Sequence, residues 1–258
     1  MTLSNPQGGD CQGENPLDLS DLVPEHEWAQ YADLVEAAAW RNLPYCLGGG
    51  LAFSAYSFRR RGMKDVDLFI HERDKDAFIQ LVNAIGYVDF YDTQPYDRTW
   101  IYRAYRNGVV LDLIWTLPNH RVDIDDLWFD RGPVARVHGH RIMLIPPEEL
   151  IRAKIFVVQN DRTDWPDLLN VLACSGPTMD WNFLIERMAP DERLLGSLLA
   201  MFAWLRPDVA VTLPIDMWTR VGLLPPEEVT VEEDRAWLLD TRDWFGEGVT
   251  EAREVIHP

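Results

Sequence analysis

Residues 45–70, YCLGGGLAFSAYSFRRRGMKDVDLFI, decide how the rest of this sequence is interpreted. A glycine triplet, Gly48 to Gly50, precedes an apolar run, an arginine triplet and an apolar segment that contains Asp65 and Asp67. Because side chains alternate between the two faces of a strand, these two aspartates point the same way. Two carboxylates held together at the edge of a core repel each other and are costly to desolvate. A divalent cation would remove both costs, so the stretch predicts a metal site.

A third carboxylate lies in an equally apolar segment further along the chain. Residues 109–115 read VVLDLIW, which is typical of a buried strand, and Asp112 is the charged residue within it. A strand next to residues 65–70 would bring Asp112 beside the first pair, in an oxygen-rich site that suits Mg²⁺ or Mn²⁺. The glycine turn before an expected helix at 51–58 would offer backbone N–H groups to phosphate. This combination indicates phosphoryl or nucleotidyl transfer.

The composition describes a folded and strongly acidic protein. Of its 258 residues, 47% are hydrophobic and 26% are charged, and the net charge is −18. Cys11, Cys46 and Cys174 are odd in number and lack CxxC spacing, which gives neither a disulfide framework nor a zinc site. Without an apolar run of membrane-spanning length or a signal-peptide pattern, we expect a cytoplasmic protein with no membrane partner. The acidity argues against a broad nucleic-acid surface, because it would repel the phosphate backbone.

Hydrophobic patterning predicts an α+β protein in which a flexible tail at 1–22 is followed by a mixed α/β domain at 23–145 and a helical domain at 146–258. Within the α/β domain the pattern predicts helices at 24–41, 51–58 and 74–85, strands at 43–47, 65–70, 87–91, 99–105 and 109–115, and a hairpin of 134–137 with 141–145. Within the helical domain it predicts helices at 148–158, 165–173, 181–188 and 192–204, and another around 231–244.

The order of these motifs resembles the nucleotidyltransferase fold of the DNA polymerase β superfamily, in particular the small bacterial nucleotidyltransferase-like proteins and their toxin-type group. The shared features are a glycine pair, a helix, Asp-x-Asp in a strand and a third Asp on a later strand. The resemblance implies a mixed sheet flanked by helices, followed by a mainly helical region. Arg61 matches an arginine that often stands four residues before the first Asp, whereas Met63 and Leu51 replace the usual Thr and Ser.

The resemblance extends to residues 151–172, which look like a lysine-containing helix followed by Arg-x-Asp-x-x-Asp. The matching positions are Lys154, Arg162, Asp164 and Asp167. From the residues alone, Asp164 is the expected N-cap of a helix and Asp167 adds negative charge to its first turn. Lys154 lies along an apolar stripe, where it either extends to solvent from the helix edge or pairs with a triphosphate or the carboxylates.

The resemblance implies a metal-dependent enzyme that moves a nucleoside monophosphate from an NTP, such as ATP, to an acceptor and releases pyrophosphate. In that interpretation Mg²⁺ or Mn²⁺ is the cofactor. The metal ligands would be Asp65, Asp67 and Asp112, the catalytic residues would be these three with Lys154, and the nucleotide-binding residues would be Gly49, Gly50, Arg61 and Lys154.

Several alternatives stay open at the level of sequence. The acceptor is a small hydroxylated or aminated molecule, a protein or an RNA end, and a toxin-type protein would have an antitoxin-like partner. A catalytically degenerate member would bind a nucleotide or partner without turnover, and sugar-nucleotide glycosyltransferases also use Asp-x-Asp with Mn²⁺. Asp112 could be a core carboxylate that an arginine satisfies. His138 and His140 could bind a metal or simply form a polar turn.

Overall fold

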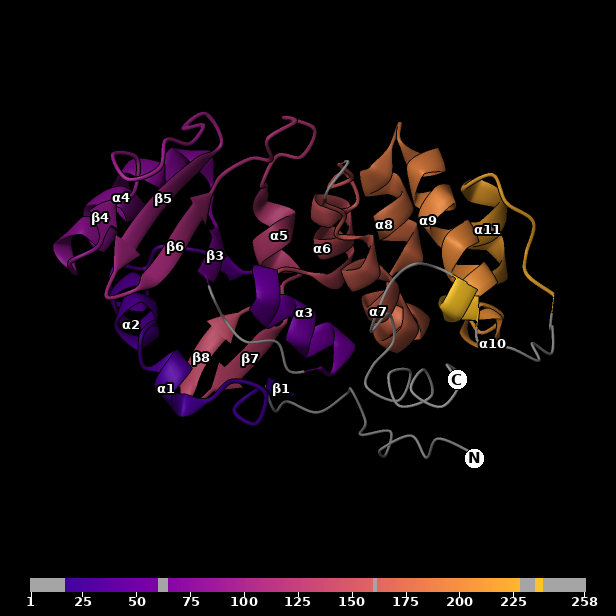
Figure 1. Cartoon of the computed structure of the whole chain (residues 1–258), viewed down its shortest axis with the longest axis horizontal. Coiled ribbons are helices and arrows are strands. Elements are labelled where there is room, and N and C mark those ends of the chain that lie inside the picture. Colours follow the sequence, from indigo (N-terminus) through magenta and orange to yellow (C-terminus); the bar gives the residue numbers. More distant parts are fainter. Residues whose placement is uncertain (1–16, 60–64, 160–161, 228–234, 239–258) are drawn as a thin grey trace, which may run out of the picture.

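The computed structural model of the chain describes residues 17–59, 65–159, 162–227 and 235–238. Figure 1 shows an elongated molecule with β-sheets at one end and mostly helices at the other. A mixed sheet and a smaller second sheet are flanked by helices, so the expected α+β class is confirmed. Within the described ranges, no helix combines the length and the apolar character that crossing a membrane would require.

The larger sheet carries the motifs that the sequence singles out. From one edge to the other its strands are β2 (Cys46–Leu47), β3 (Asp65–Phe69), β6 (Val109–Ile114), β5 (Ile101–Arg106) and β4 (Val88–Asp89). Strands β3 and β6 are parallel, and the other neighbouring pairs are antiparallel. The hairpin of β5 and β6 turns at Asn107 and Gly108, whose φ angles of 52° and 87° suit a tight two-residue turn.

Helices cover this sheet, and their bounds differ in part from the predicted ones. They are α1 (Glu25–Trp28), α2 (Ala32–Trp40), α3 (Gly49–Ser57), the short η1 (Glu72–Asp74) and α4 (Lys75–Ala84). The predicted helix at 24–41 is wrong as one element, because a turn at 29–31 divides it into α1 and α2. Helix α3 begins inside the glycine triplet, two residues earlier than predicted. Gly86, with φ of 93°, follows α4 as the predicted stop.

The smaller sheet corrects the prediction for the N-terminal segment. Its strands are β1 (Leu17–Asp18), β7 (Val134–Val137) and β8 (His140–Met143). Strand β1 pairs in parallel with β7, and Leu19 is only 1% exposed, so residues 17–22 are not a free tail. The β7–β8 hairpin holds this segment in place, since the His138 ring lies 2.6 Å from the Val23 carbonyl oxygen. His140 accepts a hydrogen bond from the indole of Trp28 over 3.0 Å, so both histidines have structural partners.

Helix α5 (Asp126–Asp130), which was not predicted, precedes the β7–β8 hairpin. After residue 146 the described chain is helical, as predicted, with α6 (Pro147–Lys154), α7 (Trp165–Ser175), η2 (Gly176–Thr178), α8 (Trp181–Met188), α9 (Glu192–Leu205), α10 (Pro207–Ala210), α11 (Ile215–Arg220) and η3 (Arg235–Leu238). Helix α8 has the predicted bounds, but α6 ends at Lys154, four residues before the predicted end. The chain beyond it forms an antiparallel bridge between Val158 and Thr163, and β-branched residues favour such extended backbone. The helix predicted around 231–244 lies largely outside the described residues.

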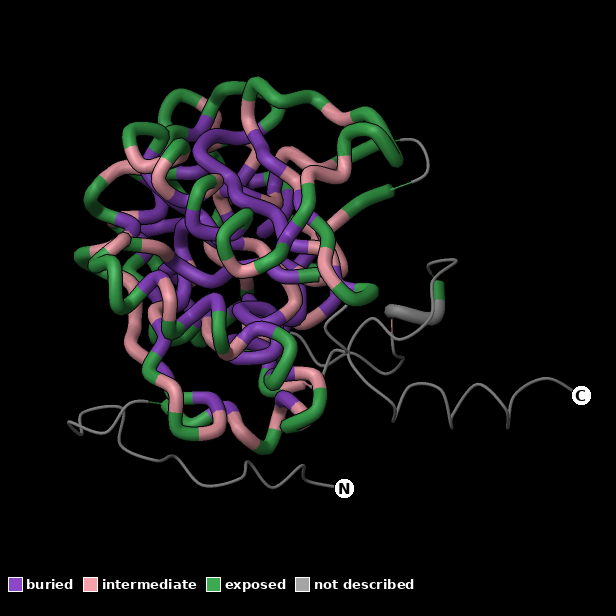
Figure 2. Tube along the Cα trace, turned by 90° about the vertical axis from the view of Figure 1, so that its left-hand side faces the viewer, coloured by how far each residue is buried: buried purple, intermediate pink, exposed green. Residues whose placement is uncertain are grey.

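Two hydrophobic cores meet at α6 and α7. Leu150 and Ala153 pack into the core that the sheets share, whereas Ile151 and Ile155 pack into the core of the helical end. Figure 2 shows buried segments through the interior of the molecule and exposed segments around them. Because α6 contributes to both cores, the two ends are packed together and not merely linked. A domain boundary near residue 145 stays a prediction.

Candidate functional site

The strand register assembles three of the predicted site residues in adjacent positions. Asp67 on β3 lies directly opposite Asp112 on β6, and Arg103 on β5 lies opposite Asp112 on its other side. Residues in register across neighbouring strands project from the same face of a sheet. Asp67, Asp112 and Arg103 therefore form one row across three strands, with Asp65 two residues before Asp67 on the same face. The prediction that a neighbouring strand brings Asp112 beside the pair is confirmed.

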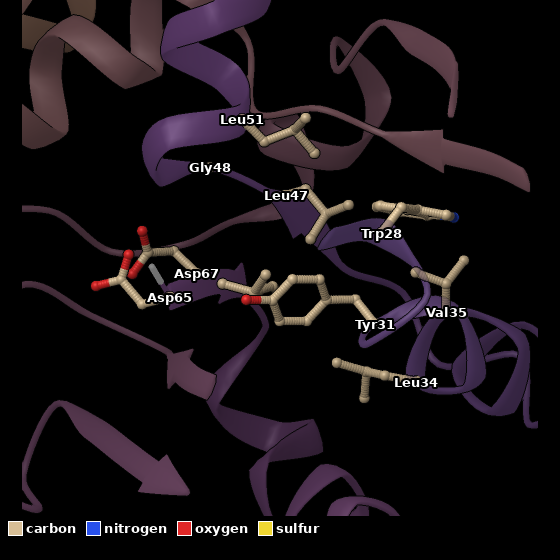
Figure 3. A pocket seen from close by; sticks show the side chains of 10 residues that line it. Trp28, Tyr31, Leu34, Val35, Leu47, Gly48, Leu51, Asp65 and Asp67 are labelled. Carbon is tan, nitrogen blue, oxygen red and sulfur yellow. The ribbon is translucent and has the colours of Figure 1, made fainter. Parts of the chain in front are cut away.

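The carboxylates of Asp65 and Asp67 lie side by side at the start of β3 (Figure 3). Asp65 is exposed and Asp67 is partly buried. Burial, and then repulsion from Asp65 and Asp112, raise the pKa of Asp67 to about 7, although Lys154 and Arg103 act in the opposite direction. Among the described residues, Lys154 and Arg103 therefore do not offset the burial and repulsion that raise this pKa.

The glycine turn is in direct contact with this strand. Gly48 is the N-cap of α3 and donates its backbone N–H to the Asp67 carbonyl oxygen over 3.0 Å. A Cβ on Gly49 would lie 1.8 Å from Oδ2 of Asp67, and Gly49 also has a φ of 52°. A Cβ on Gly48 would lie 2.2 Å from the Phe69 ring. Only glycine fits at these two positions, and the N-terminus of α3 consequently lies against the carboxylates.

Asp112 is held by an arginine in two parallel hydrogen bonds. Arg103 donates from Nε to Oδ1 over 2.7 Å and from Nη2 to Oδ2 over 2.6 Å. The side chain of Asp112 is 4% exposed and that of Arg103 is 32% exposed. Burial raises the pKa of Asp112, and the guanidinium counteracts that rise. The alternative in which an arginine satisfies this core carboxylate is confirmed for the structure described here.

Arg103 is not among the site residues predicted above, although the sequence contains the signal for it. A two-residue turn at Asn107 and Gly108 fixes the register of the hairpin, with Arg106 opposite Val109. Three residues further from the turn on each strand, Arg103 faces Asp112.

Lys154 is the last residue of α6, and it forms ion pairs with Asp164 and Asp167, the two aspartates that match the family pattern. Its Nζ atom lies 2.8 Å from Oδ2 of Asp164 and 3.2 Å from Oδ2 of Asp167. Burial alone would raise the pKa of Asp164, but Lys154 and Arg162 bring it below its ordinary value. Asp164 is the N-cap residue of α7, yet its side chain makes no capping hydrogen bond. The predicted N-cap position is confirmed, but the carboxylate pairs with Lys154 instead of capping the helix.

A narrow crevice runs behind the carboxylates toward α1 and α2. Its lining includes Tyr31, Leu47 and Gly48 as well as Asp65 and Asp67, and Tyr31 is directed toward the carboxylates (Figure 3). Burial raises the pKa of the Tyr31 hydroxyl, and the charges of Asp65 and Asp67 contribute to that rise. The crevice has a free volume of about 10 Å³, which is room for about one water molecule. A nucleotide would therefore have to bind on the open side of the carboxylates.

The carboxylates of Asp65 and Asp67 fit a magnesium ion. Mg²⁺ is usually bound by one or two carboxylates together with substrate phosphates, and Asp65 and Asp67 offer such a pair. Across the described parts of the chain, no three His, Cys, Asp or Glu side chains are grouped to hold a metal ion. Of the three carboxylates, Asp112 is the one that an arginine of the described chain pairs with directly. Arg61 lies outside the described residues.

Comparison with known proteins assigns this arrangement to a family. The family model described as "Nucleotidyl transferase of unknown function (DUF2204)" matches residues 39–192, more than half of the chain, and this range includes every predicted site residue. No curated protein matches the chain.

Several solved structures are similar to this chain at low sequence identity. The lincomycin-bound lincosamide antibiotic adenylyltransferase LnuA is 19% identical, with a TM-score of 0.42, over 59% of this chain and 98% of that chain. The antibiotic-resistance factor ANT(2'')-Ia is 17% identical, with a TM-score of 0.45, over 70% and 97%. An antigenic nucleotidyltransferase-like protein from Paracoccidioides brasiliensis is 19% identical, with a TM-score of 0.45, over 74% and 93%.

Proposed function

Because the chain belongs to the family described as "Nucleotidyl transferase of unknown function (DUF2204)", we propose that it is a metal-dependent enzyme that moves a nucleoside monophosphate from an NTP to an acceptor. The observation that carries the proposal is the pair of carboxylates of Asp65 and Asp67 against the N-terminus of α3. A metal–triphosphate complex requires carboxylates that bind the cation and a neighbouring helix N-terminus that binds the phosphates, and this site has both.

Each group at the site has a role in this proposal. Asp65 and Asp67 would hold the divalent cation, which neutralises charge on the triphosphate when it is bound. Backbone N–H groups at Gly49 and Gly50 offer partial positive charge to the phosphate oxygens. Lys154 adds a positive charge near Asp67. When the substrate binds, Lys154 leaves its ion pairs with Asp164 and Asp167 and pairs with the triphosphate.

The proposed reaction is a displacement at the α-phosphorus. A hydroxyl or amine of the acceptor attacks, the bond between the α-phosphorus and the bridging oxygen breaks, and pyrophosphate leaves. Asp112 would join Asp65 and Asp67 on the cation and help to take the proton of the attacking group, which requires that it be free of Arg103 at that stage.

The acceptor class follows from the charge of the protein. A net charge of −18 repels a nucleic-acid backbone, so a hydroxyl or amine on a small molecule or a protein is favoured over an RNA end. An antitoxin-like partner and a cytoplasmic location remain expectations from the sequence.

The test is pyrophosphate release from each of the four NTPs with Mg²⁺ or Mn²⁺ across a panel of acceptors, with EDTA as the blank. Asp65→Asn and Asp67→Asn should each lower the rate about 100-fold or more, equivalent to about 2.7 kcal/mol in the activation barrier. Asp76→Asn is the matched control, because Asp76 is an exposed aspartate on α4, a different element from the site. Unchanged rates in both site variants would refute the roles given to these carboxylates.

The wild type and the same variants also test the alternative of a catalytically degenerate member that binds a nucleotide without turnover. The pairing of Asp112 with Arg103 favours this alternative. Calorimetric titration with a non-hydrolysable NTP analogue would then show Mg²⁺-dependent binding that Asp67→Asn abolishes. Pyrophosphate release would stay at the blank level for every acceptor. Release of a nucleoside diphosphate from a sugar nucleotide would instead indicate glycosyl transfer.

A further inference from the structure

The three carboxylates of the site are only partly compensated by two cations described beside them, Lys154 and Arg103. Asp65, Asp67 and Asp112 project from one face of the sheet, and among the described residues Lys154 and Arg103 are cations that act on Asp67. Lys154 is already shared between Asp164 and Asp167. Lys154 acts on Asp67 more strongly than Arg103 does, but Arg103 is the one that is hydrogen-bonded directly to one of the three carboxylates, that of Asp112. The pKa of Arg103 is itself raised, chiefly by the hydrogen bonds to Asp112 and then by the charges of Asp112, Asp65 and Asp67.

The two partners differ in their freedom to move. Asp112 has a short side chain, 4% exposed, on the strand between β3 and β5. Arg103 has a long side chain, 32% exposed, and can swing into solvent with its guanidinium still hydrated. Separating the pair thus costs little for Arg103, whereas it leaves Asp112 as a buried and unpaired charge. A cation that reaches Asp112 from the side of Asp67 would satisfy it again.

We propose that Arg103 is a built-in counter-ion that competes with the divalent cation for Asp112. Before the cation binds, the guanidinium satisfies Asp112 and keeps it from the other two carboxylates. When a cation binds at Asp65 and Asp67, Asp112 turns to it and Arg103 is released. Arg103 is in this account a positioning residue. The inference rests on the proposed function, because it takes the carboxylate pair to be the cation site.

The test compares cation-linked stability and affinity in Arg103→Met, which keeps an apolar stem and removes the charge. The melting temperature is measured in EDTA and in Mn²⁺, and the dissociation constant for Mn²⁺ is measured by electron paramagnetic resonance. In EDTA the variant should melt below the wild type, because Asp112 is left unpaired beside Asp67. Its rise in melting temperature with Mn²⁺ should exceed that of the wild type, and its affinity should be about 5-fold tighter or more.

Two control variants isolate the competition. Arg106→Met removes an arginine from the same strand whose carboxylate partner, Asp33, lies on α2 away from the site, and it should leave the Mn²⁺ affinity unchanged. Arg103→Met combined with Asp112→Asn should restore stability in EDTA and lose the gain in affinity. If Arg103→Met does not fold in either condition, Arg103→Lys replaces it, with the same direction and a smaller change.

The outcomes separate this inference from the function on which it rests. Mn²⁺ binding that is equal or weaker in Arg103→Met than in the wild type overturns the competition, and the proposed function stands if the wild type still binds Mn²⁺ through Asp67. Absence of Mn²⁺ binding in both proteins overturns the inference and the metal site together. Tighter binding in the double variant as well would show that Asp112 is not the contested ligand, which also overturns the inference.

Discussion

Two glycines with positive φ angles, Gly49 at the site and Gly139 in a hairpin turn, allow the effect of a contact at the site to be measured apart from that of backbone strain. Gly49→Ala adds a Cβ 1.8 Å from the Asp67 carboxylate at a φ of 52°, whereas Gly139→Ala adds one in open space at a φ of 85°. Both variants should lose about 1 kcal/mol of stability from the positive φ. Gly49→Ala should additionally displace the carboxylate and weaken Mn²⁺ binding about 10-fold or more.

Urea unfolding and Mn²⁺ titration of the two variants check this. Equal Mn²⁺ affinities would mean that the contact between Gly49 and Asp67 does not matter for the site.

Asp67 makes stability depend on pH in an unusual direction. Its pKa is about 7 in the folded protein, raised by burial and by Asp65 and Asp112, against an ordinary value of 3.8. Between about pH 4 and 7 the unfolded chain has lost this proton while the folded protein retains it. The contribution of Asp67 to the free energy of unfolding therefore falls as pH rises through that window, by at most about 1.4 kcal/mol per pH unit.

Urea unfolding in EDTA from pH 4.5 to 8 measures this slope, and Asp67→Asn removes the group. The variant should gain stability relative to the wild type as pH rises to about 7 and show a constant difference above it. A difference that does not vary with pH would contradict the raised pKa.

Lys154 connects two helices, α6 and α7, through charge. Lys154→Met leaves Asp164 and Asp167, whose side chains are 12% and 21% exposed, without this partner, and should cost about 2 kcal/mol of unfolding free energy. Lys75→Met is the control, because it loses a solvent-exposed pair with Glu72 and a contact of 5.5 Å between the ammonium and the Trp115 ring, which should together change stability by less than about 1 kcal/mol.

Urea midpoints for the two lysine variants make the comparison. A Lys154→Met midpoint equal to that of Lys75→Met would contradict the stabilisation expected from the pairs with Asp164 and Asp167.

The elements differ in how far the sequence predicts them. Strands β3 and β6 were predictable because short apolar runs are typical of buried strands, and helix α8 because its apolar residues recur at helical spacing. Strand β1 was not, because two residues carry no periodic signal and the pairing with β7 depends on distant chain. The early end of α6 depends likewise on the bridge between Val158 and Thr163.

The site shows the same division. The hairpin turn makes the pairing of Arg103 with Asp112 predictable, whereas the parallel register of Asp67 with Asp112 is set by tertiary packing. The contact between Gly49 and Asp67 was beyond sequence reasoning for the same reason.

At the scale of the whole molecule, the two hydrophobic cores share helices α6 and α7. Leu150 and Ile151 are adjacent in sequence but pack into different cores, so neither core can open without exposing the other. We expect one cooperative unfolding transition. In scanning calorimetry the ratio of the calorimetric to the van 't Hoff enthalpy should be close to 1.

Two resolved transitions would contradict this expectation and support separate domains at residue 145. An Ile151→Ala variant provides the internal check, because it should lower a single melting temperature and not create a second one.

The contacts of Gly48 and Gly49 bear on how such glycine motifs are used as markers of activity. The Phe69 ring excludes a larger side chain at Gly48 whether or not a nucleotide binds, whereas at Gly49 the close contact is with the Asp67 carboxylate itself. A relative that had lost catalysis would still require glycine at the first position as long as it kept the same aromatic ring beneath it. In this fold the first glycine is diagnostic of architecture, and the second glycine and the state of the carboxylates are the better diagnostics of catalysis.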